Sequence, residues 1–357
     1  MIGSASSERV SKEFGFQWHI TNFCNLSCKH CYQDDFTQNE DLSPENIKKI
    51  IRIISEALID RSISINLTGG EPFLRKDLFE IMESFESIEN IKGYNIITNV
   101  MPLTKEKIQA LEKFAKLNQL KISLEFPESQ MNDSIRGKGS FEKCIVNFEM
   151  LKQMSSKEKV LMFTLGSYNY QYLVSAKDQT GMLDFAHEIG ADAVILERFV
   201  PLGQGKALCT KYLKSSEWLE VIENVIEFTN LDATPEDLLP YKAFHVGFKN
   251  DLELQGALCN LGDESMALMP NGDIYPCRRL PLKIGNILKD DFNSILTKLK
   301  MLRESFDYHL QGKCSTCLID DCIGCRALTY ALTNDLFASD PQCYRTEKVR
   351  SLKVPIV

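Results

Sequence analysis

Apolar residues alternate with polar ones in six short runs, which lie at residues 16–21, 63–68, 94–100, 120–126, 160–166 and 193–199. This period of two predicts β-strands. Helical periodicity lies between and after these runs. Ser43 followed by Pro44 marks the start of a first helix, and Thr104 and Ser140 mark two more. Further helices are predicted over 76–87, 181–189 and 216–228.

Six strand–helix units in succession predict an α/β fold with parallel strands and right-handed crossovers. Six units are too few to close an eightfold barrel, so the pattern favours a partial (β/α)6 barrel. The predicted divisions are a tail over residues 1–15, the barrel over 16–230 and a cysteine-rich extension over 231–357. Active sites in such folds lie at the carboxyl ends of the strands.

Composition limits the cell compartment and the classes of partner that are expected for this chain. The chain has 357 residues, 44% of them hydrophobic, and a net charge of −8, which argues against nucleic acid as the main ligand. No apolar run is long enough to span a membrane, and the first seven residues do not form a signal peptide. A cytoplasmic protein is therefore predicted, and its twelve cysteines indicate metal ligands rather than disulfides.

Three cysteines follow the first predicted strand at a C-x3-C-x2-C spacing: Cys24, Cys28 and Cys31. Structural zinc usually takes four ligands, whereas three close thiols with no local fourth suit a [4Fe–4S] cluster with one open iron. A zinc loop or unrelated thiols are the alternatives at this point.

This segment resembles the signature of radical S-adenosylmethionine (SAM) enzymes. The resemblance implies that the open iron is chelated by SAM, which is split reductively to give a 5′-deoxyadenosyl radical that abstracts hydrogen from the substrate. It also implies that His30 lies against the adenine, and that flavodoxin or ferredoxin supplies the electron. Polar residues at later strand ends match family positions that contact SAM: Gly69, Gly70, Glu71, Thr98, Asn99, Ser123, Glu125, Arg136 and Arg198. Taken singly, each is equally consistent with a solvated strand end.

Seven more cysteines lie in the carboxyl-terminal part, from Cys259 to Cys343, and a hairpin is predicted over 266–277 with Asn271-Gly272 at its turn. Four of them, at C-x2-C-x4-C-x2-C, are consistent with two zinc ions when taken alone. The wider pattern resembles the SPASM extension of radical SAM enzymes, which holds two auxiliary [4Fe–4S] clusters, for three in all. The resemblance assigns Cys259, Cys277 and Cys325 to the first auxiliary cluster, and Cys314, Cys317, Cys322 and Cys343 to the second.

Two features depart from that family pattern. The double cysteine pair is shorter by one residue in each of its two later gaps. The first auxiliary cluster also lacks a fourth cysteine close before Cys259, so its fourth iron is open or is ligated from elsewhere, with Cys209 as the nearest candidate. Cys144 lies in a helical run and is predicted to be a core thiol.

SPASM enzymes mostly modify peptides, so the resemblance favours a maturase that forms a thioether or carbon–carbon crosslink in a ribosomally made peptide. Formylglycine formation in sulfatases is less favoured, because Arg278 stands where those enzymes carry an aspartate base. Arg278 is instead expected to pair with an acidic substrate residue. Leader recognition would come from a separate protein or from the barrel itself. A radical SAM enzyme acting on a small molecule and an iron–sulfur electron carrier are the remaining alternatives.

Overall fold

Six parallel strands follow one another across the sheet in chain order. The computed structural model describes residues 13–249, 252–320 and 322–345. The strands are β1 (Glu13–Thr21), β2 (Ser62–Gly69), β3 (Ile91–Thr98), β4 (Leu117–Ser123), β5 (Glu158–Leu165) and β6 (Ala193–Arg198). Each predicted strand is confirmed, with its ends moved by a few residues. The sheet does not close, which confirms the predicted partial barrel.

Strands from the carboxyl-terminal part extend this sheet at both edges. Next to β6 lie the antiparallel strands β7 (Ala243–Gly247) and β8 (Glu253–Ala257). Next to β1 lies the parallel strand β9 (Ser265–Leu268), followed by the antiparallel strands β10 (Asp273–Tyr275) and β11 (Gly285–Asn286). The β9–β10 pair is the predicted hairpin. The domain division at residue 230 stays a prediction, because the described sheet runs through both parts.

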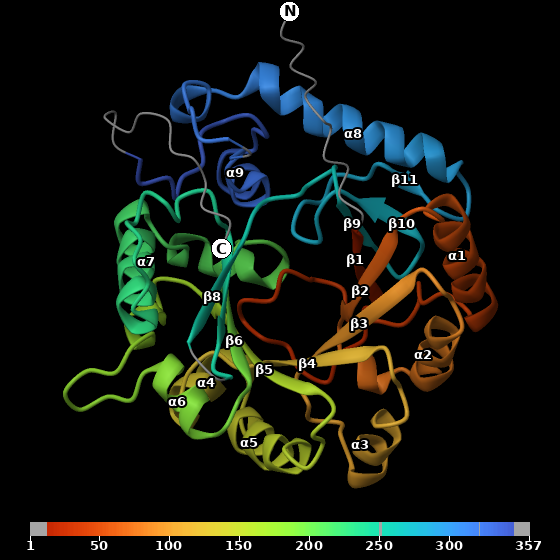
Figure 1. Ribbon diagram of the computed structural model, residues 1–357, viewed down its shortest axis with the longest axis horizontal. Helices are drawn as coiled ribbons and strands as arrows, with labels where there is room; N and C mark the ends of the chain where they lie inside the picture. Colours follow the sequence, from red (N-terminus) through yellow and green to blue (C-terminus); the bar gives the residue numbers. More distant parts are fainter. Residues whose placement is uncertain (1–12, 250–251, 321, 346–357) are drawn as a thin grey trace, which may run out of the picture.

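Helices cover the outside of the sheet (Figure 1). Those within the barrel are α1 (Pro44–Ala57), α2 (Leu78–Glu86), α3 (Lys105–Leu111), α4 (Ser129–Arg136), α5 (Ser140–Leu151), α6 (Met182–Glu188) and α7 (Ser215–Thr229). The carboxyl-terminal part adds α8 (Phe292–His309) and α9 (Arg326–Thr333). Neither α4, α8 nor α9 was predicted from the periodicity.

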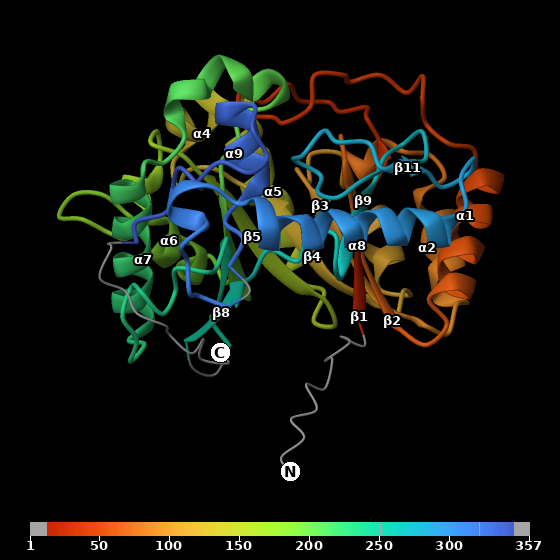
Figure 2. The same cartoon turned by 90° about the horizontal axis from the view of Figure 1, so that it is seen from above.

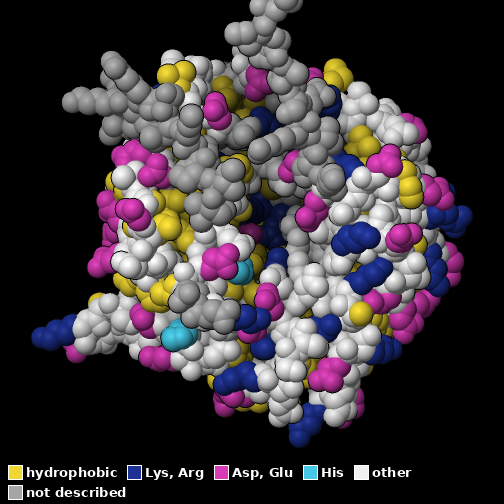
Figure 3. Space-filling model, in the orientation of Figure 1, with side chains coloured by type: hydrophobic (Ala, Val, Ile, Leu, Met, Phe, Trp, Pro, Cys, Tyr) yellow, Lys and Arg dark blue, Asp and Glu magenta, His cyan; other side chains and the backbone are white. Residues whose placement is uncertain are grey.

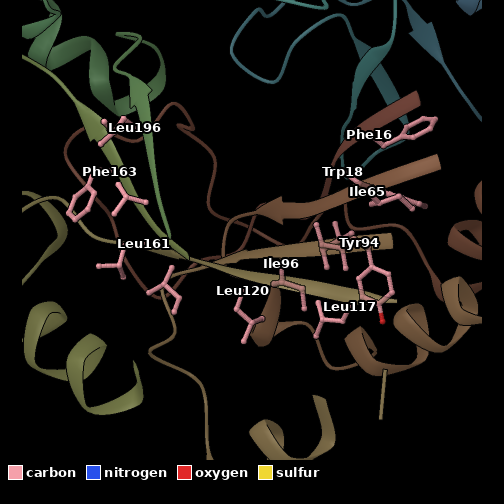
Figure 4. Close-up of a cluster of buried hydrophobic side chains, with 14 of the residues drawn as sticks. Phe16, Trp18, Ile65, Tyr94, Ile96, Leu117, Leu120, Leu161, Phe163 and Leu196 are labelled. Atoms are coloured by element: carbon pink, nitrogen blue, oxygen red, sulfur yellow. The ribbon is translucent and has the colours of Figure 1, made fainter. Parts of the chain in front are cut away.

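The alternation of side chains divides the sheet into an apolar outer face and a polar inner face. On β1, Phe16 and Trp18 are buried against the helices, while Gln17 and His19 alternate with them. Figure 4 shows Phe16, Trp18, Ile65 and further apolar side chains on this outer side. The inner face is therefore free to carry chemistry, and Figure 2 shows the loop after β1 on the side opposite the strand starts.

Candidate functional site: a cysteine-lined cavity in the barrel

A glycine turn after β2 holds the cysteine loop at the carboxyl end of β1. The backbone N–H of Gly70 donates to the Thr21 carbonyl at 2.8 Å, and the N–H of Glu71 donates to the Phe23 carbonyl at 2.8 Å. A Cβ atom on Gly70 would overlap the Phe23 carbonyl oxygen, and Gly69 has φ +121°. Both positions therefore require glycine, because the two backbones approach too closely for any side chain.

The three cysteines of this loop line one cavity of about 900 Å³. Most of the residues predicted to bind SAM line the same cavity: His30, Gly69, Gly70, Thr98, Asn99, Ser123, Glu125, Arg136 and Arg198. The structure thus brings together residues that are far apart in the sequence.

Glu125, just beyond β4, is the centre of a buried charged cluster. Its Oε1 lies 3.0 Å from Arg136 Nη1 and 3.2 Å from His30 Nε2. Its Oε2 accepts the Thr164 N–H at 3.0 Å. Glu125 is 1% exposed and Arg136 is 7% exposed. The cluster fixes His30 while leaving His30 Nδ1, a buried atom, without a protein partner.

Glu71 does not line the cavity but supports it. Its carboxylate accepts hydrogen bonds from the Thr98 hydroxyl at 2.8 Å, the Asn99 N–H at 2.7 Å and the Phe73 N–H at 3.1 Å. Burial raises the pKa of Glu71 to about 6 despite these donors. The carboxylate thus ties the end of β3 to the glycine turn, which is a positioning role.

Asn99 extends this support to the cysteines. Its side-chain amide donates to Asn25 at 2.9 Å and lies 3.7 Å from Cys24 Sγ. The predicted strand-end residues therefore hold the cysteine loop as well as facing the cavity.

An ion cluster forms one wall of the cavity. Glu197 on β6 pairs with Arg278, and Arg279 Nη1 lies 3.7 Å from the same carboxylate. The neighbouring Arg278, Arg279 and Lys121 hold the pKa of Glu197 below its usual range, although burial acts in the opposite direction. All three side chains of the cluster line both this cavity and a second one.

Arg198 lines the cavity as well, but its guanidinium already has partners. The guanidinium is 3.2 Å from Asp340 Oδ2, donates to the Tyr241 carbonyl at 3.0 Å and lies over the Trp218 ring. A contact between Arg198 and SAM stays a prediction.

The carboxyl-terminal cysteines separate into two groups. Cys259, Cys277 and Cys325, the first group, line the second cavity, which encloses about 1330 Å³. The second group lines a smaller cavity of about 360 Å³ and consists of Cys314, Cys317, Cys322 and Cys343. The grouping matches the one implied by the family resemblance. Cys209 is exposed outside the first group, and Cys144 lies in the hydrophobic core as predicted.

The thiols of the three cysteine groups are not drawn together around single points. Among the described residues, no three His, Cys, Asp or Glu side chains are spaced to hold one metal ion. A zinc ion draws its ligand atoms to about 2.3 Å from one point, whereas a cluster distributes its thiolates over separate irons. Burial raises the pKa of Cys24 to about 11 and that of Cys31 to about 12, so metal binding must displace protons.

Figure 3 shows a hollow near the centre of the face seen in Figure 1, with Lys and Arg side chains inside it. The second cavity lies between the two edges of the barrel, since residues of β1, β9 and the end of β8 line it. Its basic lining includes Lys242, Arg278 and Arg279.

Sequence reasoning missed Glu197 and Lys242. A signal was present for Glu197, because a charged residue on the inner side of a buried strand is uncommon. No such signal marks Lys242, whose surroundings come from three distant segments.

Comparisons with known proteins agree with this geometry. Residues 18–178 match the Radical SAM superfamily, and residues 259–318 match SPASM, an iron-sulfur cluster-binding domain. The chain is 28% identical to the AdoMet-dependent heme synthase of Methanosarcina barkeri, over 93% of this chain and 96% of that protein. It is 26% identical to the mycofactocin maturase MftC of Mycolicibacterium smegmatis, over 91% and 81% of the two chains.

The fold also matches a crystal structure of Streptococcus suis SuiB bound to precursor peptide SuiA. The TM-score is 0.69 at 16% identity, and the match covers 93% of this chain and 76% of that one. Among the helices of the described residues, none is long and apolar enough to cross a bilayer.

Proposed function

Because the chain belongs to the radical SAM superfamily and carries its SPASM iron–sulfur extension, we propose that it matures a ribosomally made peptide. The reaction is hydrogen abstraction by a 5′-deoxyadenosyl radical, followed by formation of a thioether or carbon–carbon crosslink. Three [4Fe–4S] clusters serve it, one on the cysteine loop and one on each carboxyl-terminal cysteine group. The clusters supply electron transfer, and the chain binds, orients and shields the reactants.

The observation that carries this proposal is an open cleft next to the cysteine-lined cavity. The cleft has a volume of about 900 Å³ and is bordered by the loop after β1 and by the β9–β10 hairpin. Tyr32, Gln33 and Arg278 line both the cleft and the cavity, so the two adjoin at these residues. An extended peptide segment suits such a cleft, since its backbone can hydrogen-bond to a polar border.

The relatives add support from outside the structure. The mycofactocin maturase matches along most of both chains, and SuiB, which shares the fold, has been crystallised with a precursor peptide. A separate leader-recognition protein remains part of the proposal.

Side chains of the cavity have separable tasks. His30, Gly69, Gly70 and Ser123, which line the cavity, would contact SAM, and Thr98, Asn99, Glu125 and Arg136 would hold the site around it. Forming a crosslink removes two hydrogens from the peptide. One is transferred to the deoxyadenosyl group, and the other leaves as a proton and an electron. The first cysteine group lines the second cavity together with Glu197; a cluster held there would supply an acceptor for that electron.

Arg278 is the proposed substrate contact. It borders the cleft, the cavity and the first cysteine group, and it lies 5.7 Å from the centroid of the Tyr32 ring. Arg278 already pairs with Glu197, so it is not a free cation. A substrate carboxylate near the modified position therefore has to bind Arg278 while Glu197 is still bound to it.

A substitution series tests this contact. Arg278→Ala is expected to lower the yield of peptide product per deoxyadenosine, because substrate positioning is lost. Arg278→Lys keeps the charge without the planar fork and should fall between Ala and wild type. Mass spectrometry of the peptide, with deoxyadenosine counted in parallel, measures the ratio. An unchanged ratio in Arg278→Ala would remove the residue from substrate recognition.

A second candidate function is transformation of a tetrapyrrole. The nearly end-to-end match with a heme synthase favours it, and the basic second cavity offers room for a multiply charged small molecule. This candidate uses the same SAM site and differs only in the substrate.

One experiment separates the two candidates. The protein is reconstituted anaerobically with iron and sulfide, then given SAM, a reductant such as flavodoxin or ferredoxin, and either substrate. A peptide encoded by a neighbouring reading frame is expected to lose two hydrogens, as seen by mass spectrometry. An unmodified peptide together with conversion of a heme precursor would replace the peptide proposal by the tetrapyrrole one.

A further inference from the structure

Lys242 is shared by the two carboxyl-terminal cysteine groups. It stands directly before β7 and lines both the second cavity and the smaller one. Its Nζ donates to Cys322 Sγ at 3.6 Å. Its backbone N–H donates to the Ala257 carbonyl at 2.7 Å, which fixes the position of the residue at the edge of the sheet. The ammonium group therefore lies at a defined place between the two groups of thiols.

Asp340 connects the same two groups through hydrogen bonds. Its carboxylate accepts the Cys325 N–H at 2.8 Å, and its own backbone N–H donates to Cys314 Sγ at 3.4 Å. Arg198 balances the carboxylate at 3.2 Å, and Asp340 is 5% exposed. One aspartate thus joins a ligand residue of the first group to a sulfur of the second.

Among the described basic residues that line the smaller cavity, Lys242 is the one whose charged group donates to a ligand sulfur, that of Cys322. Lys313 donates to the Arg345 carbonyl, and Arg198 is paired with Asp340. Arg326 lies outside that lining and reaches Cys314 Sγ at 3.8 Å, but its Nη1 donates to the backbone carbonyls of residues 336 and 338.

We propose that Lys242 raises the reduction potential of the cluster held by the second cysteine group. Reduction adds negative charge to the cluster, and a cation that donates to a ligand sulfur stabilises the reduced form. The effect is strong here because partial burial weakens solvent screening. The inference rests on the cluster assignment in the proposed function.

The consequence is a direction for electron flow. An electron that leaves the substrate by way of the first group then moves towards the second, along the hydrogen-bonded connection through Asp340. The electron is then held at the second group. It cannot return easily through the first group to the oxidised substrate.

The test is a redox titration of the reconstituted holoenzyme followed by electron paramagnetic resonance. Lys242→Met is expected to lower the equilibrium constant for reduction of the second cluster by at least tenfold. For one electron this corresponds to a reduction potential lower by 59 mV or more. Lys242→Arg, which keeps the charge, should restore the wild-type value. Lys249→Met is the matched control, since Lys249 is exposed and pairs with Glu158 and Asp192. Its potentials should equal those of wild type.

Signal assignment uses two further measurements. Added SAM identifies the cluster that binds it, and a Cys277→Ala background removes the first auxiliary signal. If Lys242→Met fails to retain iron, Lys242→Gln answers the same question, because it keeps a donor without the charge.

The outcomes are distinct. An unchanged potential in iron-replete Lys242→Met, or an equal shift in Lys242→Arg, would overturn this inference and leave the proposed function standing. A wild-type protein with zinc or no iron in the second group would overturn the cluster assignment together with the inference. Metal analysis of the wild-type protein is therefore done before any Lys242 variant is made.

Discussion

Removing the Glu125 carboxylate is expected to destabilise the protein far more than removing a surface carboxylate. Glu125→Ala leaves the buried Arg136 guanidinium without its ion-pair partner at 3.0 Å and the Thr164 N–H without its acceptor. The matched control is Glu83→Ala, whose partner Lys113 lies at the same 3.0 Å distance but with both side chains more than half exposed.

The loss of folding stability in each variant depends on how deeply the ion pair is buried. Breaking a buried pair costs about 3–5 kcal/mol, because the remaining charge has neither partner nor water. An exposed pair contributes below about 1 kcal/mol. With an unfolding entropy of about 2.1 cal/mol/K per residue, a loss of about 4 kcal/mol lowers the Tm of this 357-residue chain by about 5 °C if it unfolds in one step.

Thermal and urea unfolding of both variants, without iron, measure this difference. The double variant Glu125→Ala/Arg136→Met should recover part of the loss, because it also removes the stranded charge. If Glu125→Ala and Glu83→Ala lower the Tm equally, the carboxylate is not the centre of a buried charge cluster and the reasoning fails.

Three further outcomes are expected. Replacing Cys24, Cys28 and Cys31 together by Ala should abolish SAM cleavage while iron stays in the carboxyl-terminal groups; continued deoxyadenosine formation would contradict the SAM site. Iron analysis of the reconstituted wild type should give about twelve irons per chain if every cluster is [4Fe–4S], and about four irons with zinc would remove the auxiliary clusters. Gly70→Ala should cost about 1–3 kcal/mol by overpacking and lower iron retention, whereas Gly15→Ala, whose added Cβ would make ordinary contacts, should show neither effect in the same assays.

The local sequence determined the parts of this protein that depend on near neighbours. Alternation of apolar residues located all six parallel strands, because a strand that packs helices on one face must alternate. Caps such as Ser43 and Thr104 accept backbone N–H groups as predicted. The cysteine loop was also predictable, since its three thiols lie within eight residues and follow a strand end.

Only the tertiary structure decided how distant charges are paired. Arg278 was predicted to await an acidic substrate, but the fold places it on Glu197, 81 positions away in the chain. Arg198 was predicted to contact SAM; it lines the cysteine-lined cavity, and the fold also places its guanidinium on Asp340, 142 positions away. Glu197 and Arg198 end β6, whereas Arg278 follows β10 and Asp340 follows α9, so only the fold brings these partners together. Such pairings depend on the order of the strands and on burial, and neither can be read from adjacent residues. The sequence therefore determined which charged groups are present, and the fold determined which of them are neutralised.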